Sequence, residues 1–81
     1  DYNAALNAIK RIERPGRQIL ETKQKVLFQL GAQEFINGNM NNAIQFFNNT
    51  IAMGDYDLTS LSNALYWRGE SYYRIGNFDI T

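Results

Sequence analysis

The chain has 81 residues, with eight Lys or Arg and eight Asp or Glu, so its formal net charge is zero. This balance argues against binding of nucleic acid or acidic membranes through bulk charge. The absence of Cys and His excludes disulfides, a thiolate nucleophile, an imidazole base and the usual zinc sites. The hydrophobic content of 44% is too high for a disordered tail, and no apolar run approaches the roughly 20 residues of a membrane span. We therefore expect one small globular unit with no cofactor and no membrane insertion.

Apolar residues at helical spacing predict a first helix over residues 3–13, which Pro15-Gly16 then ends. Its apolar stripe consists of Ala5, Ala8, Ile9 and Ile12. A second helix is expected over about residues 18–37, with Gly38-Asn39 as a left-handed cap at its end. Its stripe consists of Leu20, Leu27, Leu30 and Gly31.

A third helix is expected over residues 40–53, closed by Gly54, and a fourth over about residues 60–75, closed by Gly76-Asn77. The stripe of the third helix consists of Met40, Ala43, Ile44, Phe47 and Ile51. That of the fourth consists of Ala64, Leu65, Tyr72 and Ile75, and its N-terminal cap is expected at Asp57, Thr59 or Ser60. No segment alternates as a strand does, so the expected fold class is all-α, with about four helices.

The sequence repeats itself with a period of 38 residues and no gaps. The identical pairs are Asn3–Asn41, Ala5–Ala43, Gly16–Gly54, Leu20–Leu58, Leu27–Leu65, Gly31–Gly69, Gly38–Gly76 and Asn39–Asn77. Phe28–Tyr66 and Phe35–Tyr73 are conservative pairs. The period divides the chain into residues 1–16, one full repeat over residues 17–54 and the start of the next over residues 55–81.

The motifs within each unit resemble the tetratricopeptide repeat (TPR) family, whose pattern is Trp-x-x-Leu-Gly-x-x-Tyr, Gly, a small Ala, an aromatic and Ala. The residues that carry the resemblance are Leu27–Gly31, Phe35, Gly38-Asn39, Ala43-Ile44, Phe46-Phe47, Leu65–Gly69, Tyr72-Tyr73 and Gly76-Asn77. The resemblance implies antiparallel helix-turn-helix repeats that form a right-handed solenoid. Residues 63–73 are similar to repeats of bacterial cell-envelope TPR proteins, which favours a bacterial source and the periplasm or cell envelope over the cytoplasm.

In this family the first helices line a concave groove, so the resemblance implies a protein-interaction scaffold. It nominates as partner-binding residues Lys25, Phe28, Gln29, Ala32, Phe35, Asn63, Tyr66, Trp67, Glu70, Tyr73 and Arg74. Peptide-binding members clamp a C-terminal carboxylate with Lys and Asn at some of these places. This chain has Phe28, Ala32, Tyr66 and Glu70 there, which favours an apolar peptide, extended or helical.

A simpler interpretation of the same residues stays open. Aromatic side chains on such helices more often pack in the core, which applies above all to Phe28, Phe35 and Trp67. Glu70 and Arg74 are four residues apart, the spacing of an ordinary ion pair on a helix surface.

Two further motifs suggest other functions. Lys10, Arg11, Arg14 and Arg17 form a basic run that would suit RNA or phosphate, although such a run more often ends a solvated helix. Asp55-Tyr56-Asp57-Leu58-Thr59 matches the Asp-x-Asp-x-Thr of aspartate-nucleophile phosphatases, but a helix end precedes it, so a capping role is expected. No nucleophile–base pair can be drawn, and we do not expect an enzyme.

A unit that begins with a second helix and ends with a first helix is expected to lack a neighbour at both ends. The residues expected to be exposed there are Ala5, Ile9 and Ile12 at one end and Leu65 and Tyr72 at the other. We therefore expect copies of the chain to associate as a homo-oligomer, head to tail or by exchange of helices.

Overall fold

The computed structural model describes the backbone of residues 1–80 and the side chains of residues 1–76. It contains four helices, α1 (Tyr2–Lys10), α2 (Arg17–Ile36), α3 (Met40–Ala52) and α4 (Leu58–Ile80). No strand occurs within residues 1–80, so the expected all-α class with four helices is confirmed.

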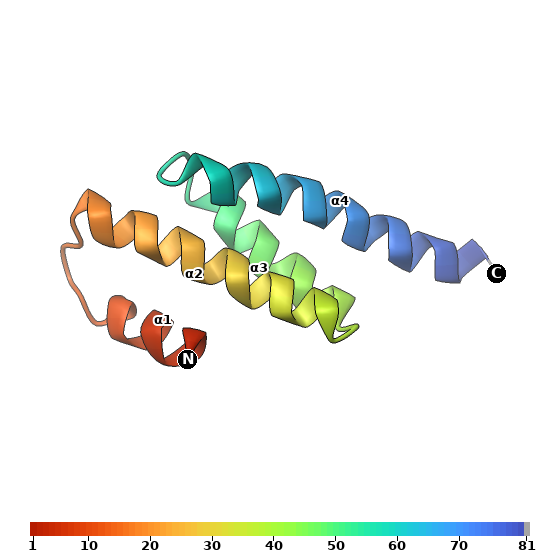
Figure 1. Cartoon of the computed structure of the whole chain (residues 1–81), viewed down its shortest axis with the longest axis horizontal. Coiled ribbons are helices and arrows are strands. Elements are labelled where there is room, and N and C mark those ends of the chain that lie inside the picture. The colour runs from red at the N-terminus through yellow and green to blue at the C-terminus, as the bar shows by residue number, and fades with distance from the viewer. Residues whose placement is uncertain (81) are drawn as a thin grey trace.

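The helices are arranged around α2. It forms a hairpin with α3, and it also packs against α1 and α4, while α3 packs against α4. Figure 1 shows α2 and α4 side by side with α3 behind them, and α1 on the other side of α2. α2 and α4 thus form a common surface made by two helices that share a place in the repeat.

Two glycines make the turns that the sequence predicted. Gly38 and Gly54 have φ of 85° and 94°, a backbone region that L side chains rarely adopt. The backbone N–H of Asn39 donates to the carbonyl oxygen of Glu34 at 2.8 Å, which closes the last turn of α2. Of the three expected caps of α4, Asp57 is the one used: its Oδ2 accepts from the backbone N–H of Ser60 at 3.0 Å.

Two helix ends differ from the prediction. α1 ends at Lys10, because the N–H groups of Arg11 and Ile12 bond carbonyls three residues back, which tightens the last turn before Pro15. Ile12 therefore lies beyond the helix. α4 does not end at Gly76 but continues to Ile80. A lone glycine costs a helix only about 1 kcal/mol, and no described segment folds back on α4 as α3 does on α2.

The core has two clusters. Leu6 of α1 packs with Val26, Leu27 and Leu30 of α2, and Ala43 and Phe47 of α3 pack with Ala64 of α4. The closest approach of two helices lies at Gly31, where an added Cβ would be 2.5 Å from Cε1 of Phe47. Only a residue without a side chain allows α3 to lie this close to α2.

A buried glutamine, which the sequence did not single out, ties α2 to the connection between α3 and α4. Gln24 is fully buried, and its Nε2 donates to the carbonyl oxygens of Thr50 at 2.9 Å and Gly54 at 2.6 Å. Its Oε1 accepts from the backbone N–H of Asp57 at 2.5 Å. One side chain therefore satisfies three backbone groups, one in a buried contact and two in partly buried contacts.

Candidate functional site

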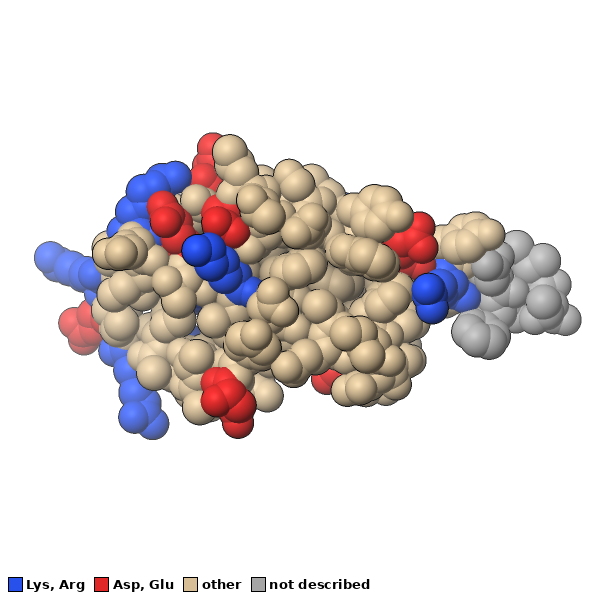
Figure 2. Space-filling view, viewed as in Figure 1, with Lys and Arg blue, Asp and Glu red and all other residues tan. Residues whose placement is uncertain are grey.

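The residues proposed for partner binding all lie on α2 and α4, whose shared surface we call the α2–α4 groove. α2 carries Lys25, Phe28, Gln29, Ala32 and Phe35, and α4 carries Asn63, Tyr66, Trp67, Glu70, Tyr73 and Arg74. The two helices are in contact, and across this contact the fold brings Phe35 together with Trp67 and Arg74. Figure 2 shows a broad surface with few charged side chains on this face.

Aromatic rings connect α2 with α4 across the groove. The ring of Phe35 on α2 meets that of Trp67 on α4 edge-on, with 5.2 Å between centroids. Trp67 in turn meets Tyr66 edge-on at 5.0 Å. The guanidinium of Arg74 lies 4.7 Å from the centroid of Phe35. These contacts fix the orientation of the rings relative to one another.

The same rings take part in the core, as the simpler interpretation expected. Phe28, Phe35 and Trp67 are half-buried and pack against the cluster of Ala43, Phe47 and Ala64. By contrast, Tyr66 and Tyr73 are 61% and 65% exposed. The groove thus has an aromatic floor that belongs to the core and an aromatic rim that is open to solvent.

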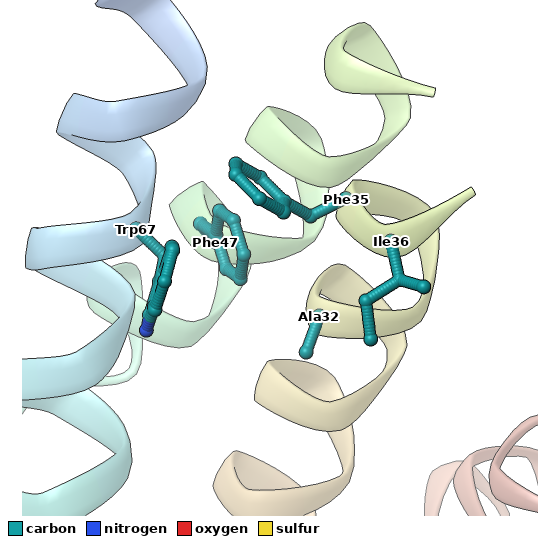
Figure 3. A pocket seen from close by; sticks show the side chains of 5 residues that line it. All are labelled: Ala32, Phe35, Ile36, Phe47 and Trp67. Carbon is teal, nitrogen blue, oxygen red and sulfur yellow. The ribbon is translucent and has the colours of Figure 1, made fainter. Parts of the chain in front are cut away.

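A cavity of about 270 Å³ opens in this floor. Its walls come from three helices (Figure 3): Ala32, Phe35, Ile36, Phe47 and Trp67. Ile36 and Phe47 were not among the residues proposed for binding. Ile36 is 81% exposed, the largest value among the exposed hydrophobic side chains. The sequence repeat did not mark Ile36, because the residue 38 positions later is Arg74.

The polar members of the set surround this apolar surface. Lys25, Gln29 and Asn63 are exposed, and Glu70 is half-buried. No ion pair joins Glu70 to Arg74 among the side chains of residues 1–76, where Arg74 stacks on Phe35 instead. Lys25 lies close enough to Asp57 to help lower the pKa of that carboxyl, although the hydrogen bond from the Ser60 hydroxyl is the main cause.

The basic run at the end of α1 is only partly free. Arg17 forms an ion pair with Glu21 at 3.4 Å, donates to the carbonyl oxygen of Asp55 at 3.1 Å and lies over the ring of Tyr56 at 5.3 Å. Lys10, Arg11 and Arg14 are exposed. Figure 2 shows Lys and Arg gathered at this end of the molecule, with acidic side chains among them.

The residues proposed for self-association divide into two groups. Leu65 and Tyr72 on α4 are 47% and 55% exposed. Ile12 is 40% exposed, but Ala5 and Ile9 are half-buried rather than open, because α1 lies on α2 through Leu6. The exposed part of α1 is therefore shifted toward Ala8, which belongs to the predicted apolar stripe but not to the residues proposed for self-association.

The arrangement favours binding of apolar groups. Within the described residues there is no group of three acidic, His or Cys side chains that could hold a metal ion. Asp57, the second acid of the Asp-x-Asp-x-Thr motif, is engaged as a helix cap, which confirms the capping role.

Among the described residues we find no helix whose length and hydropathy would let it cross a membrane. Comparisons with protein-family models, curated proteins and solved structures gave no match.

Proposed function

We propose that this chain is a helical-repeat module of the TPR type that binds a peptide or protein partner in the α2–α4 groove, as part of an interaction scaffold. The observation that carries the proposal is the apolar cavity between Ala32, Phe35 and Trp67, beside which the exposed ring of Tyr66 meets Trp67 edge-on. Pre-formed aromatic pockets of this kind are where binding energy concentrates in protein interfaces.

The chemistry of the groove specifies the partner in outline. A cavity of about 270 Å³ accepts a large aliphatic or aromatic side chain as an anchor. Tyr66 and Tyr73 offer apolar rings for the flanking residues and hydroxyls for hydrogen bonds. Lys25 and Arg74 supply positive charge at the rim, and Glu70 supplies one negative charge. Charged groups on the partner therefore determine the orientation in which it binds more than they contribute to the affinity.

The direct test is a selection of random linear peptides displayed on phage against the 81-residue chain. Selected peptides should share one large apolar residue. Synthetic versions should shift the fluorescence emission of Trp67, the only tryptophan in the chain. Ala32→Phe places a ring in the cavity and should weaken binding at least about tenfold. Ala4→Phe, at an exposed alanine of α1, should leave binding unchanged.

Two results would reject the proposal. One is a set of selected peptides that share no large apolar residue. The other is that Ala32→Phe and Ala4→Phe bind the selected peptides with the same affinity. Binding to RNA is the alternative function, and a salt titration separates it. Contacts between phosphates and Lys10, Arg11 or Arg14 would weaken steeply with salt, whereas an apolar anchor in the groove would not.

A further inference from the structure

We infer that the exposed face of α4 formed by Leu65, Gly69 and Tyr72, here called the α4 face, binds helix α1 of a second copy of this chain. The contact joins the tail of one copy to the head of the next. It uses a different side of α4 from the groove and does not depend on the proposed function.

The contact between α3 and α2 shows what the α4 face is shaped to receive. α3 lies on α2 at Gly31, where an added Cβ would be 2.5 Å from Phe47 Cε1 and 3.2 Å from Phe46 Cβ. Leu27, one turn before Gly31, is buried in the neighbouring cluster with Phe46 at its edge. A leucine and a glycine four residues apart on α2 thus form the surface on which a second helix packs.

α4 carries the same leucine–glycine pair, but no described helix packs on it. Leu65 and Gly69 follow Leu27 and Gly31 at the 38-residue period. Leu65 is 47% exposed, and a Cβ added at Gly69 would meet no atom within 4 Å. Tyr72, one turn further on, is 55% exposed, so the apolar surface continues along the helix. Apolar surface in this pattern gains stability when another helix covers it.

α1 is the counterpart of α3, and it has the matching face free. It buries Leu6 against α2, and the residue 38 positions later, Ile44, is likewise buried. Its other side carries Ala8, which is exposed, and Ile12, which is 40% exposed. Ala8 corresponds to Phe46, whose Cβ lies at Gly31, so α1 presents to solvent the side with which α3 covers α2.

Charge complementarity supports the same alignment. Within one chain Arg17 donates to the carbonyl oxygen of Asp55, the residue 38 positions later. If the second copy continues the 38-residue repeat of the first, Arg17 of the second copy lies beside Asp55 of the first copy. Lys10, Arg11 and Arg14 precede Arg17 in the same segment, and Asp57 follows Asp55. A basic head therefore meets an acidic loop at the start of α4.

Because the two surfaces differ, every open assembly has one uncovered α4 face at one end and one uncovered α1 at the other. Such a heterologous contact does not close on itself unless the copies form a ring. We therefore expect a ladder of species that grows with chain concentration, measured by sedimentation velocity and by light scattering on a sizing column.

Two variants each remove one surface. Gly69→Leu fills the α4 face, where the open space leaves the folded chain undisturbed. Ala8→Arg places a charge on the free side of α1, where residue 8 is exposed. Each variant alone should be monomeric, with association weakened at least about tenfold. Gln45→Leu and Gln45→Arg, at an exposed position of α3, are matched controls that should associate as the parent chain does.

Mixing the two variants tests the head-to-tail geometry directly. The Gly69→Leu chain keeps a good α1, and the Ala8→Arg chain keeps a good α4 face, so the mixture should form a one-to-one dimer and nothing larger. Three results would overturn the inference: a parent chain that is monomeric at every concentration, a parent chain that stops at a symmetric dimer, or a mixture with no dimer although both variants are folded by circular dichroism.

Discussion

Gly31 and Phe47 are in such close contact that a Cβ on residue 31 would lie 2.5 Å from Cε1 of the phenylalanine ring. Phe47 is fully buried between α2 and α4 and cannot move aside without opening the cluster that it forms with Ala43 and Ala64. The glycine therefore sets the distance between the two helices of the repeat.

Gly31→Ala should lower the free energy of unfolding by about 1–3 kcal/mol, the usual cost of forcing an extra carbon into a packed core. Gly69→Ala is the matched control. Its Cβ meets nothing, and alanine is the better helix former, so it should raise the free energy of unfolding by up to about 1 kcal/mol. Urea denaturation at low chain concentration measures both. Equal effects of the two changes would show that the α2–α3 contact is looser than described.

Replacement of Gln24 should be among the most destabilising single changes. Gln24→Leu would leave the carbonyls of Thr50 and Gly54 and the N–H of Asp57 without their partner. Each buried group left unpaired costs about 1–3 kcal/mol, so we expect a loss of at least about 2 kcal/mol in urea denaturation. Gln45→Leu, at an exposed glutamine, should change stability by less than about 0.5 kcal/mol. A small effect at residue 24 would contradict the role of its side chain as a tie between helices.

The sequence predicted the presence of the helices better than their ends. The period of apolar residues was enough to find four helices, and Gly38 and Gly54 adopt the positive φ expected of them. Gly76 repeats Gly38 in sequence but not in conformation. The turn at Gly38 is stabilised by α3 packing back onto α2, and that stabilisation comes from a contact between helices, not from the residues at the turn.

The sequence repeat predicted the α2–α4 groove, but it did not predict the roles of Gln24 and Ile36. Gln24 lies where the helical pattern allows a surface residue, and its counterpart 38 positions later is Ser62. Only the position of the α3–α4 connection shows why a glutamine is needed there. Ile36 has Arg74 as its counterpart, so the repeat offered no reason to select it.

Acid should destabilise the chain in part through Asp57. Its pKa lies below the ordinary value of 3.8, chiefly because the Ser60 hydroxyl donates to Oδ2, with smaller contributions from the Ser60 N–H and Lys25, while partial burial opposes them. The unfolded chain therefore binds the proton more readily than the folded chain. The stabilisation is complete above the unfolded pKa and is lost as the pH falls through the folded value.

Ser60→Ala removes the main cause and should raise the pKa of Asp57 toward 3.8. The variant should be less stable than the parent chain at neutral pH. The difference should shrink as the pH falls from 3.8 through the lower pKa of Asp57 in the folded parent chain, because below that pKa the carboxyl is protonated in both chains. Urea denaturation across this range measures the difference. Thr59→Ala, at the neighbouring exposed position, is the control, and the same pH dependence in both variants would rule out the Ser60 hydrogen bond as its source.

Arg74→Ala should expose Trp67 to solvent and should lower the free energy of unfolding only slightly. The guanidinium lies 4.7 Å from the centroid of Phe35, and Phe35 meets Trp67 edge-on at 5.2 Å. Loss of an exposed cation–π contact costs about 0.5–1 kcal/mol, so the free energy of unfolding should fall by that amount. Trp67 should become more accessible, which a red shift of its emission and stronger quenching by acrylamide would report. Arg14→Ala, at an exposed arginine outside the groove, should change neither. Unchanged Trp67 emission in Arg74→Ala would mean that Arg74 does not cover this end of the groove in solution.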